Sequence, residues 1–167
     1  MSIFPDDIAA LAQQIVRDFT GRGHMLSTAE SCTGGLIAGA LTDIAGSSAV
    51  VDRGFVTYTN DAKMDMLGVT SATLETFGAV SKETALQMAH GALYRSRAEF
   101  SVAVTGIAGP GGGSAEKPVG LVHLAAKRRG GGVIHREMRY GDIGRDQVRL
   151  ATVKTALEML LELAQAA

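Results

Sequence analysis

Strand-like and helix-like segments alternate along most of this chain, and this alternation limits its fold more than any other feature. Helical spacing of apolar residues or a capping residue predicts helices over 6–20, 36–41, 81–94 and 145–166, and a short helix that Asn60 caps and that carries Lys63. β-Branched and aromatic runs predict strands at 25–26, 50–59, 100–104, 119–126 and 133–140. The last two strands flank a glycine-containing turn, which is typical of an antiparallel hairpin. We therefore predict the α/β class: a three-layer α/β/α sandwich around a mixed, mostly parallel sheet with one antiparallel hairpin.

Length and charge indicate one ordinary domain. A chain of 167 residues can bury about two thirds of its unfolded surface in one core, so we expect a single domain over residues 1–167. The formal net charge of −1 gives no reason to expect a nucleic-acid or membrane partner, and the basic run Lys127–Arg129 is typical of a solvated turn. The chain has no bilayer-length apolar run and its first residues lack a signal-peptide pattern, so we expect a cytoplasmic location.

The sequence contains no pattern typical of a metal or cofactor site. Cys32 is the only cysteine, which excludes an internal disulfide and a cysteine-built zinc site, and the four histidines have no ligand-like spacing. The glycine-rich segment Thr105–Gly113 lacks both the Gly-Lys-Ser/Thr of an ATP-binding loop and the Gly-x-Gly-x-x-Gly that binds dinucleotides. The Ser-x-x-Lys string at Ser114–Lys117 lies in a loop rather than at a helix start, so we treat it as chance. We therefore expect neither a metal nor a cofactor.

Three polar segments follow predicted strands, where ligands bind in sheets of this kind. Ser27–Gly35 brings a carboxylate, a hydroxyl, a thiol and backbone N–H groups to a helix start, although an ordinary helix cap has similar residues. Tyr58–Lys63 offers a lysine that could act as a base if it is desolvated, or that could simply be solvated on a helix. Thr105–Gly113 can point successive N–H groups at an anionic oxygen. Together the three segments predict an active site at one edge of the sheet.

Four motifs in this order resemble the CinA C-terminal domain family. They are Thr28–Gly35, Tyr58–Lys63 with Leu67–Val69, Gly78–Ala85, and Thr105–Gly112 with Lys117–Gly120, and the likeness runs from about residue 6 to residue 166. The resemblance implies a nicotinamide mononucleotide amidohydrolase of the stand-alone form, which converts that nucleotide and water to nicotinate mononucleotide and ammonia. The family's compact Gly-Asp-Arg is spread over Gly141–Arg145 here, so only Arg145, followed by Arg149, carries over and the role of Asp142 is open.

The resemblance and the chemistry of these residues lead to one mechanism. Ser31 is the expected nucleophile, Lys63 its base, and Tyr58 positions or relays the proton. Backbone N–H groups around Cys32 to Gly35 are expected to form an oxyanion hole, and Arg145 with the glycine loop to hold the phosphate. Glu30 binds ribose hydroxyls or has a structural role, and Cys32 is a second candidate nucleophile or a small buried apolar residue. The expected substrate-binding residues are Glu30, Cys32, Thr33, Gly34, Gly35, Thr105, Gly106, Ile107, Gly109 and Arg145.

Two other functional classes compete with the enzyme. One is a non-catalytic nucleotide-binding regulatory module, which would keep the pocket and lose the chemistry. The other is an oligomerisation partner for a separate domain, which would bind no ligand. The presence of Ser31, Tyr58 and Lys63 together favours the enzyme over a decayed relative. We expect a small-molecule substrate, no nucleic-acid or membrane partner, and a homo-oligomer.

Overall fold

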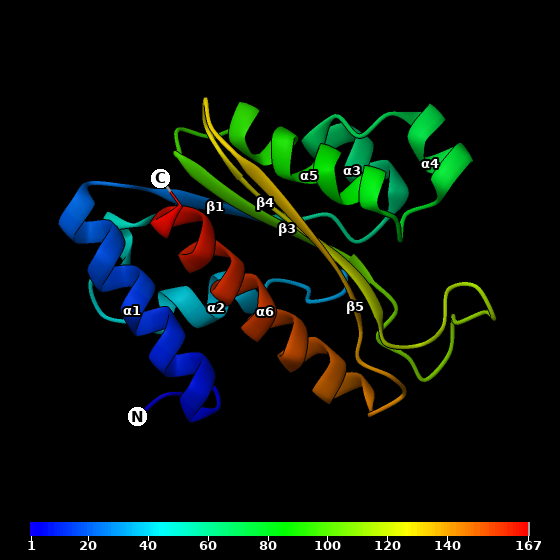
Figure 1. Ribbon diagram of the computed structural model, residues 1–167, viewed down its shortest axis with the longest axis horizontal. Helices are drawn as coiled ribbons and strands as arrows, with labels where there is room; N and C mark the ends of the chain where they lie inside the picture. The colour runs from blue at the N-terminus through cyan, green and yellow to red at the C-terminus, as the bar shows by residue number, and fades with distance from the viewer. Residues whose placement is uncertain (167) are drawn as a thin grey trace.

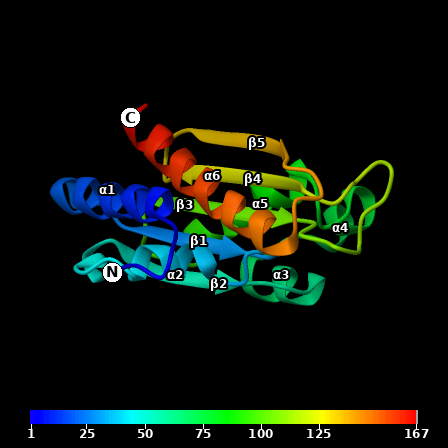
Figure 2. The same ribbon diagram turned by 90° about the horizontal axis from the view of Figure 1, so that it is seen from below.

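The computed structural model of the protein describes residues 1–166, in which all five strands join one sheet in the order β2-β1-β3-β4-β5. The elements in chain order are α1 (Asp6–Arg22), β1 (Leu26–Glu30), α2 (Leu36–Thr42), the 3₁₀ helix η1 (Ser47–Ala49), β2 (Val51–Val56), α3 (Asn60–Leu67), α4 (Ser71–Phe77), α5 (Lys82–Tyr94), β3 (Phe100–Gly106), β4 (Leu121–Arg128), β5 (Val133–Arg139) and α6 (Arg145–Gln165). Figure 2 shows the strands side by side, from β5 at one edge to β2 at the other. The expected alternation of strands and helices, closed by a hairpin, is therefore confirmed.

The sheet is mixed because one strand runs against the other four. β1 pairs in parallel with β2 and β3, whereas β4 pairs antiparallel with both β3 and β5. The β4–β5 hairpin is the one predicted from residues 119–140, with strands that begin and end within two residues of the expected positions. Because β1, β2 and β3 share one direction, their carboxyl ends lie at the same edge of the sheet.

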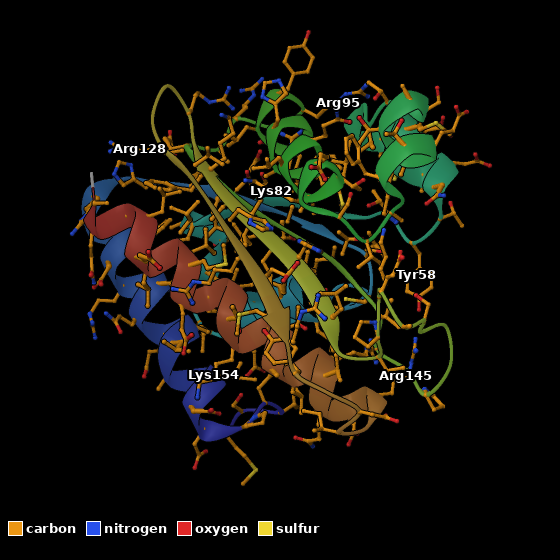
Figure 3. All side chains as sticks on the ribbon, turned by 45° about the vertical axis from the view of Figure 1, so that its right-hand side comes forward. Tyr58, Lys82, Arg95, Arg128, Arg145 and Lys154 are labelled. Atoms are coloured by element: carbon orange, nitrogen blue, oxygen red, sulfur yellow. The ribbon has the colours of Figure 1, made fainter. Side chains whose placement is uncertain are left out.

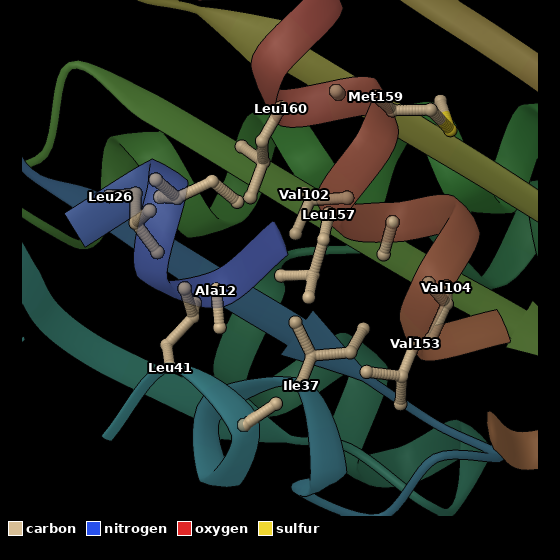
Figure 4. Close-up of a cluster of buried hydrophobic side chains, with 14 of the residues drawn as sticks. Ala12, Leu26, Ile37, Leu41, Val102, Val104, Val153, Leu157, Met159 and Leu160 are labelled. Atoms are coloured by element: carbon tan, nitrogen blue, oxygen red, sulfur yellow. The ribbon is translucent and has the colours of Figure 1, made fainter. Parts of the chain in front are cut away.

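Helices cover both faces of the sheet. Figure 1 shows α1, α2 and α6 on one face and α3, α4 and α5 on the other, which confirms the predicted three layers. Alternate residues of a strand face opposite layers, so that Val102 and Val104 pack with α1, α2 and α6, while Ala103 packs with α5. Figure 4 shows the larger core, in which Ile37 of α2 and Leu157 of α6 meet the side chains of β3.

Small strand residues bring α5 close to the sheet. The Ser101 hydroxyl donates to the carbonyl oxygen of Ala89 at 2.8 Å, and the Ser27 hydroxyl donates to that of Ala92 at 3.3 Å. Direct hydrogen bonds from strand to helix of this kind satisfy polar groups that burial would otherwise penalise. Both bonds hold the second half of α5 against the sheet, and the helix begins one residue after Ser81, which caps it as predicted.

Several local expectations are wrong. Thr59, not Asn60, caps α3, since its hydroxyl accepts from the Ala62 amide at 3.0 Å. β2 ends at Val56 rather than residue 59, and α4, which Thr70 caps, was not expected. The Thr59 cap starts a helix where the strand was expected to continue, and the Thr70 hydroxyl caps α4 in the same way.

The basic run also differs from its predicted role. The Arg129 guanidinium is not merely solvated, because it donates to the carbonyl oxygens of Ala98 at 2.9 Å and Leu93 at 2.6 Å. Arg129 thereby satisfies a carbonyl group at the end of α5.

Within residues 1–166, every helix is too short or too polar to cross a bilayer.

Candidate active site

A cavity of about 280 Å³ opens at the edge of the sheet where β1, β2 and β3 end. Each of the three segments expected there contributes to its wall, and the segment before α5 adds a fourth side. The lining residues are Ser31, Cys32, Tyr58, Asn60, Lys63, Ala79, Val80, Thr105, Gly106, Ile107, Ala108, Gly109, Gly111, Gly112 and Arg145. This set includes nine of the predicted site residues, which lie far apart in sequence.

Ser31 begins the tight turn that joins β1 to α2. Its amide donates to the Val104 carbonyl oxygen of β3 at 3.1 Å, and its carbonyl oxygen accepts from the Gly34 amide at 3.0 Å. Gly34 and Gly35 have φ of 59° and 103°, a left-handed conformation that glycine adopts without steric cost. Both ends of the Ser31 backbone are therefore fixed while its hydroxyl faces the cavity.

Lys63 is a buried lysine beside the Ser31 hydroxyl. Its side chain comes from α3, and Nζ lies 3.0 Å from Ser31 Oγ and 2.9 Å from the Thr57 carbonyl oxygen. The residue is only 1% exposed. Burial disfavours the ammonium form and lowers the pKa of Lys63 below its ordinary value. The structure thus pairs a hydroxyl with an amine that loses its proton more readily than a solvated lysine.

Cys32 is the other candidate nucleophile in this turn. The thiol is buried, and desolvation raises its pKa to about 11, so it remains protonated at neutral pH. Its alternative role as a small buried apolar residue matches its place in the core of the α1, α2 and α6 layer. Of the two adjacent groups, the Ser31 hydroxyl is the one with a basic partner.

Arg145 joins two sides of the cavity mouth. The guanidinium donates to the Tyr58 hydroxyl at 2.8 Å and to the Gly109 carbonyl oxygen at 2.8 Å. In Figure 3, Tyr58 and Arg145 lie at the same end of the molecule, beside the glycine-rich loop. Tyr58 is 56% exposed, and its hydroxyl bonds to Arg145 rather than to Ser31 or Lys63. A cationic side chain therefore lies in the cavity wall, bonded to both the Tyr58 segment and the glycine-rich loop.

The end of β3 approaches its neighbours too closely for larger residues. A Cβ on Gly106 would lie 2.6 Å from Cγ2 of Val122 and 2.9 Å from the Leu121 carbonyl oxygen. The Thr105 hydroxyl donates to the Ala79 carbonyl oxygen at 2.8 Å, which ties the end of β3 to the segment before α5. The end of β3 and the loop that follows it, from Thr105 to Gly112, thus form one wall of the cavity.

Four of the expected substrate-binding residues do not line the cavity: Glu30, Thr33, Gly34 and Gly35. The Glu30 carboxylate is 1% exposed and accepts from the Ile37 amide at 2.8 Å and the Ala38 amide at 3.0 Å, so it caps α2. It also accepts from the Thr33 hydroxyl at 2.6 Å. The Gly34 amide, expected in the oxyanion hole, already donates to Ser31. The Glu30 and Thr33 side chains and the Gly34 amide therefore bond within the turn rather than to a ligand.

Sequence reasoning did not assign several lining residues to the site. Asn60 was expected as a cap, and Ala79 and Val80 belong to the Gly78–Ala85 motif, which had no assigned role. That motif contained a usable signal: small residues before a helix cap allow the backbone to approach a pocket closely. Among the described residues, no three His, Cys, Asp or Glu side chains are grouped as a metal site would require.

An α/β domain with a buried Ser–Lys pair at the carboxyl edge of a mixed sheet is the class that this fold and site define. The chain belongs to the CinA C-terminal domain family, which it matches over residues 8–164. It is 50% identical to the nicotinamide-nucleotide amidohydrolase PncC of Escherichia coli strain K12, over 92% of this chain and 93% of that protein. A CinA-like protein of Geotalea daltonii is 48% identical over 95% of this chain but only 38% of its own length.

Solved structures support the same assignment. The competence/damage inducible protein CihA of Agrobacterium tumefaciens has a TM-score of 0.97 and 79% identity, covering 98% of this chain and 99% of that one. A CinA superfamily protein of Escherichia coli has a TM-score of 0.89 and 35% identity, covering 98% and 94% of the two chains. The architecture described above is therefore that of solved relatives.

Proposed function

We propose that this chain hydrolyses the carboxamide of nicotinamide mononucleotide and releases nicotinate mononucleotide and ammonia. The observation that carries the proposal is the 3.0 Å contact between Lys63 Nζ and Ser31 Oγ inside the cavity. Amide hydrolysis needs an activated nucleophile, and a serine with a basic partner is one form of it. The name of the Escherichia coli relative supports the choice of substrate.

The hydrogen bonds around Lys63 are compatible with the neutral amine that a base requires. A neutral amine has two N–H bonds and one lone pair, and it accepts a proton only through the lone pair. The carbonyl oxygens of Thr57 and Tyr58 lie 2.9 and 3.4 Å from Nζ and can accept both N–H bonds. The lone pair is then left for the Ser31 hydroxyl proton.

The reaction proceeds through an acyl-enzyme. Ser31 Oγ attacks the amide carbon while Lys63 takes the hydroxyl proton, and the C–N bond then breaks as Lys63 returns that proton to the leaving ammonia. A water molecule attacks the ester in turn, again with Lys63 as base, which frees the carboxylic acid and restores Ser31. The amides of Cys32 and Thr33, which have no acceptor among the described residues, are the proposed oxyanion donors. Tyr58 assists by holding Arg145.

The 5′-phosphate is proposed to bind Arg145 and the glycine loop. A charge-assisted contact to phosphate is worth roughly 1.5–3 kcal/mol, so Arg145→Ala should lower kcat/KM for the mononucleotide by about 10- to 100-fold. Nicotinamide riboside lacks the phosphate, so its kcat/KM should barely change. Measuring both substrates on both proteins tests the assignment. An equal loss on both would move Arg145 to the chemistry or the fold, and no loss would remove it from the site.

The pH dependence of the rate should follow the titration of Lys63. Because burial lowers the pKa of Lys63, its neutral, basic form is reached below the ordinary value of 10.5. We expect kcat/KM to rise with pH through that lowered pKa and then to level off. A pH–rate profile measures this directly. A rate that falls over the same range would mean that the ammonium form is the active one.

The proposed activity is tested most directly by ammonia release from nicotinamide mononucleotide, together with thermal shift. Ammonia release with a shift supports the enzyme. A shift in melting temperature without ammonia release identifies a nucleotide-binding regulatory module. If neither is observed, the chain is an oligomerisation partner that binds no ligand. Only the first outcome is compatible with the role proposed for Ser31 and Lys63.

We further propose that residues 1–167 form a single domain that self-associates. One sheet with an apolar core on each face supports a single domain. Val56 and Phe77 are large apolar side chains that are 47% and 45% exposed, and a second copy would cover such residues. Light scattering on the purified chain measures its oligomeric state.

A further inference from the structure

Arg149 lies one helical turn after Arg145 on α6 but makes different contacts. Its Nε donates to the Cys32 carbonyl oxygen at 3.0 Å, and one of its terminal nitrogens donates to the Thr33 carbonyl oxygen at 3.2 Å. Of the described residues, those lining the cavity include Arg145 but not Arg149. Arg149 therefore reaches the nucleophile turn from behind rather than through the substrate cavity.

These two bonds, together with backbone bonds inside the turn, fix where the neighbouring amides point. In a trans peptide the C=O and N–H bonds are antiparallel, so fixing one carbonyl fixes the amide of the next residue in the opposite direction. The bond to the Cys32 carbonyl sets the Thr33 amide. The Thr33 carbonyl, which accepts from Arg149 and also from the Leu36 amide at 3.1 Å, sets the Gly34 amide. That amide donates to the Ser31 carbonyl oxygen and so sets the Cys32 amide in turn.

The turn packs directly on the guanidinium. A Cβ on Gly34 would lie 3.4 Å from Nη2 of Arg149, at a residue whose φ is +59°. Two carbonyls on successive residues match the planar fork of arginine, which presents parallel donors; a lysine ammonium does not. The guanidinium also places a positive charge behind the turn, on the side away from the cavity.

We propose that Arg149 is a positioning residue that aims the Cys32 and Thr33 amides at the oxyanion of the reaction. The inference rests on the proposed amidase function. Arg149 touches no substrate atom, and its contribution is to keep two donors oriented before the negative charge develops. Such preorganised donors act on the transition state more than on the bound substrate.

The test compares Arg149→Met and Arg149→Lys with wild type on nicotinamide mononucleotide and nicotinamide riboside. One oxyanion donor raises kcat by about 10²- to 10³-fold, and a donor that points in the wrong direction loses part of this gain. Arg149→Met should therefore lower kcat by about 10- to 100-fold on both substrates. KM and the dissociation constant of nicotinate mononucleotide should change by about twofold or less, because the substitution leaves the contacts made equally in the ground state and the transition state unchanged. Arg149→Lys should stay well below wild type, because charge without the fork does not hold both carbonyls.

Lys154→Met is the matched control, since it removes a cation from the same helix where Nζ contacts Asp7 at 3.0 Å. Figure 3 shows Lys154 well away from Arg145 and Tyr58. A loss confined to the mononucleotide, seen as a raised KM, would overturn the proposal and make Arg149 a phosphate ligand. So would an unchanged kcat in Arg149→Met, or full activity in Arg149→Lys.

Folding and function are separated within the same experiment. Melting temperatures report whether each variant folds, and Arg149→Lys decides the question if Arg149→Met does not fold. An active wild type with unaffected variants contradicts this inference alone. A folded wild type that releases no ammonia from nicotinamide mononucleotide overturns the proposed function and this inference with it.

Discussion

Ser31→Ala should reduce amide hydrolysis by about four orders of magnitude or more, because removing the nucleophile removes the covalent route altogether. The substitution takes away one hydroxyl, which is hydrogen-bonded to Lys63, from a residue that is 8% exposed. Lys63 keeps the Thr57 carbonyl as a partner, so the free energy of unfolding should fall by only about 1 kcal/mol. Ammonia release, thermal unfolding and nicotinamide mononucleotide binding measure the three effects separately.

Cys32→Ala is the matched control for this substitution. It changes the adjacent residue, whose thiol has a pKa raised to about 11 and stays protonated at neutral pH. The variant should keep most of its turnover and lose some stability, since Cys32 is buried in the core. Near-normal turnover in Ser31→Ala together with an inactive Cys32→Ala would reverse the assignment of the nucleophile.

Lys63→Arg should be nearly as inactive as Lys63→Ala, with a loss of about 10²- to 10⁴-fold in kcat, the range that a general base contributes. Guanidinium stays protonated at neutral pH, so it cannot accept the Ser31 proton although it keeps the positive charge. The buried site leaves little room for the larger group, so Lys63→Met, which keeps an unbranched apolar stem, is measured beside it. Kinetics on folded protein, checked by thermal unfolding, test the expectation.

Lys82→Arg provides the control for a lysine-to-arginine change at an exposed position. Lys82 begins α5, and its side chain lies on a different part of the surface from Tyr58 and Arg145 in Figure 3. Its kinetics should match those of wild type. Substantial activity in Lys63→Arg would mean that Lys63 supplies charge rather than a base.

Local sequence patterns were sufficient for most of the fold. Helical spacing and a serine cap predicted α5, which begins one residue after Ser81 and ends at Tyr94. The hairpin and the order of strands and helices followed from the same kind of signal, because periodicity and capping act over a few residues. The three segments at strand ends were also predictable, since parallel strands bring their carboxyl ends to one edge.

The tertiary structure decided what the polar residues of those segments do. Glu30 was equally consistent with a ribose ligand until its carboxylate was found on the amides of α2. The bonds from Arg145 to Tyr58 and from Arg149 to Cys32 join residues 87 and 117 positions apart in the chain. No local pattern contains such pairs, because they depend on how α6 packs across the sheet.

Sequence alone therefore determined most of the elements and their order, because these depend on short-range backbone preferences. It also made Ser31 and Lys63 candidates, through the chemistry of their side chains and the resemblance to a family. Only the tertiary structure decided that Lys63 is buried against Ser31, that the Cys32 thiol stays protonated, and which amides remain free. The physical reason is that pKa values and hydrogen-bond partners depend on desolvation and on groups brought together by packing, neither of which is encoded in any one segment.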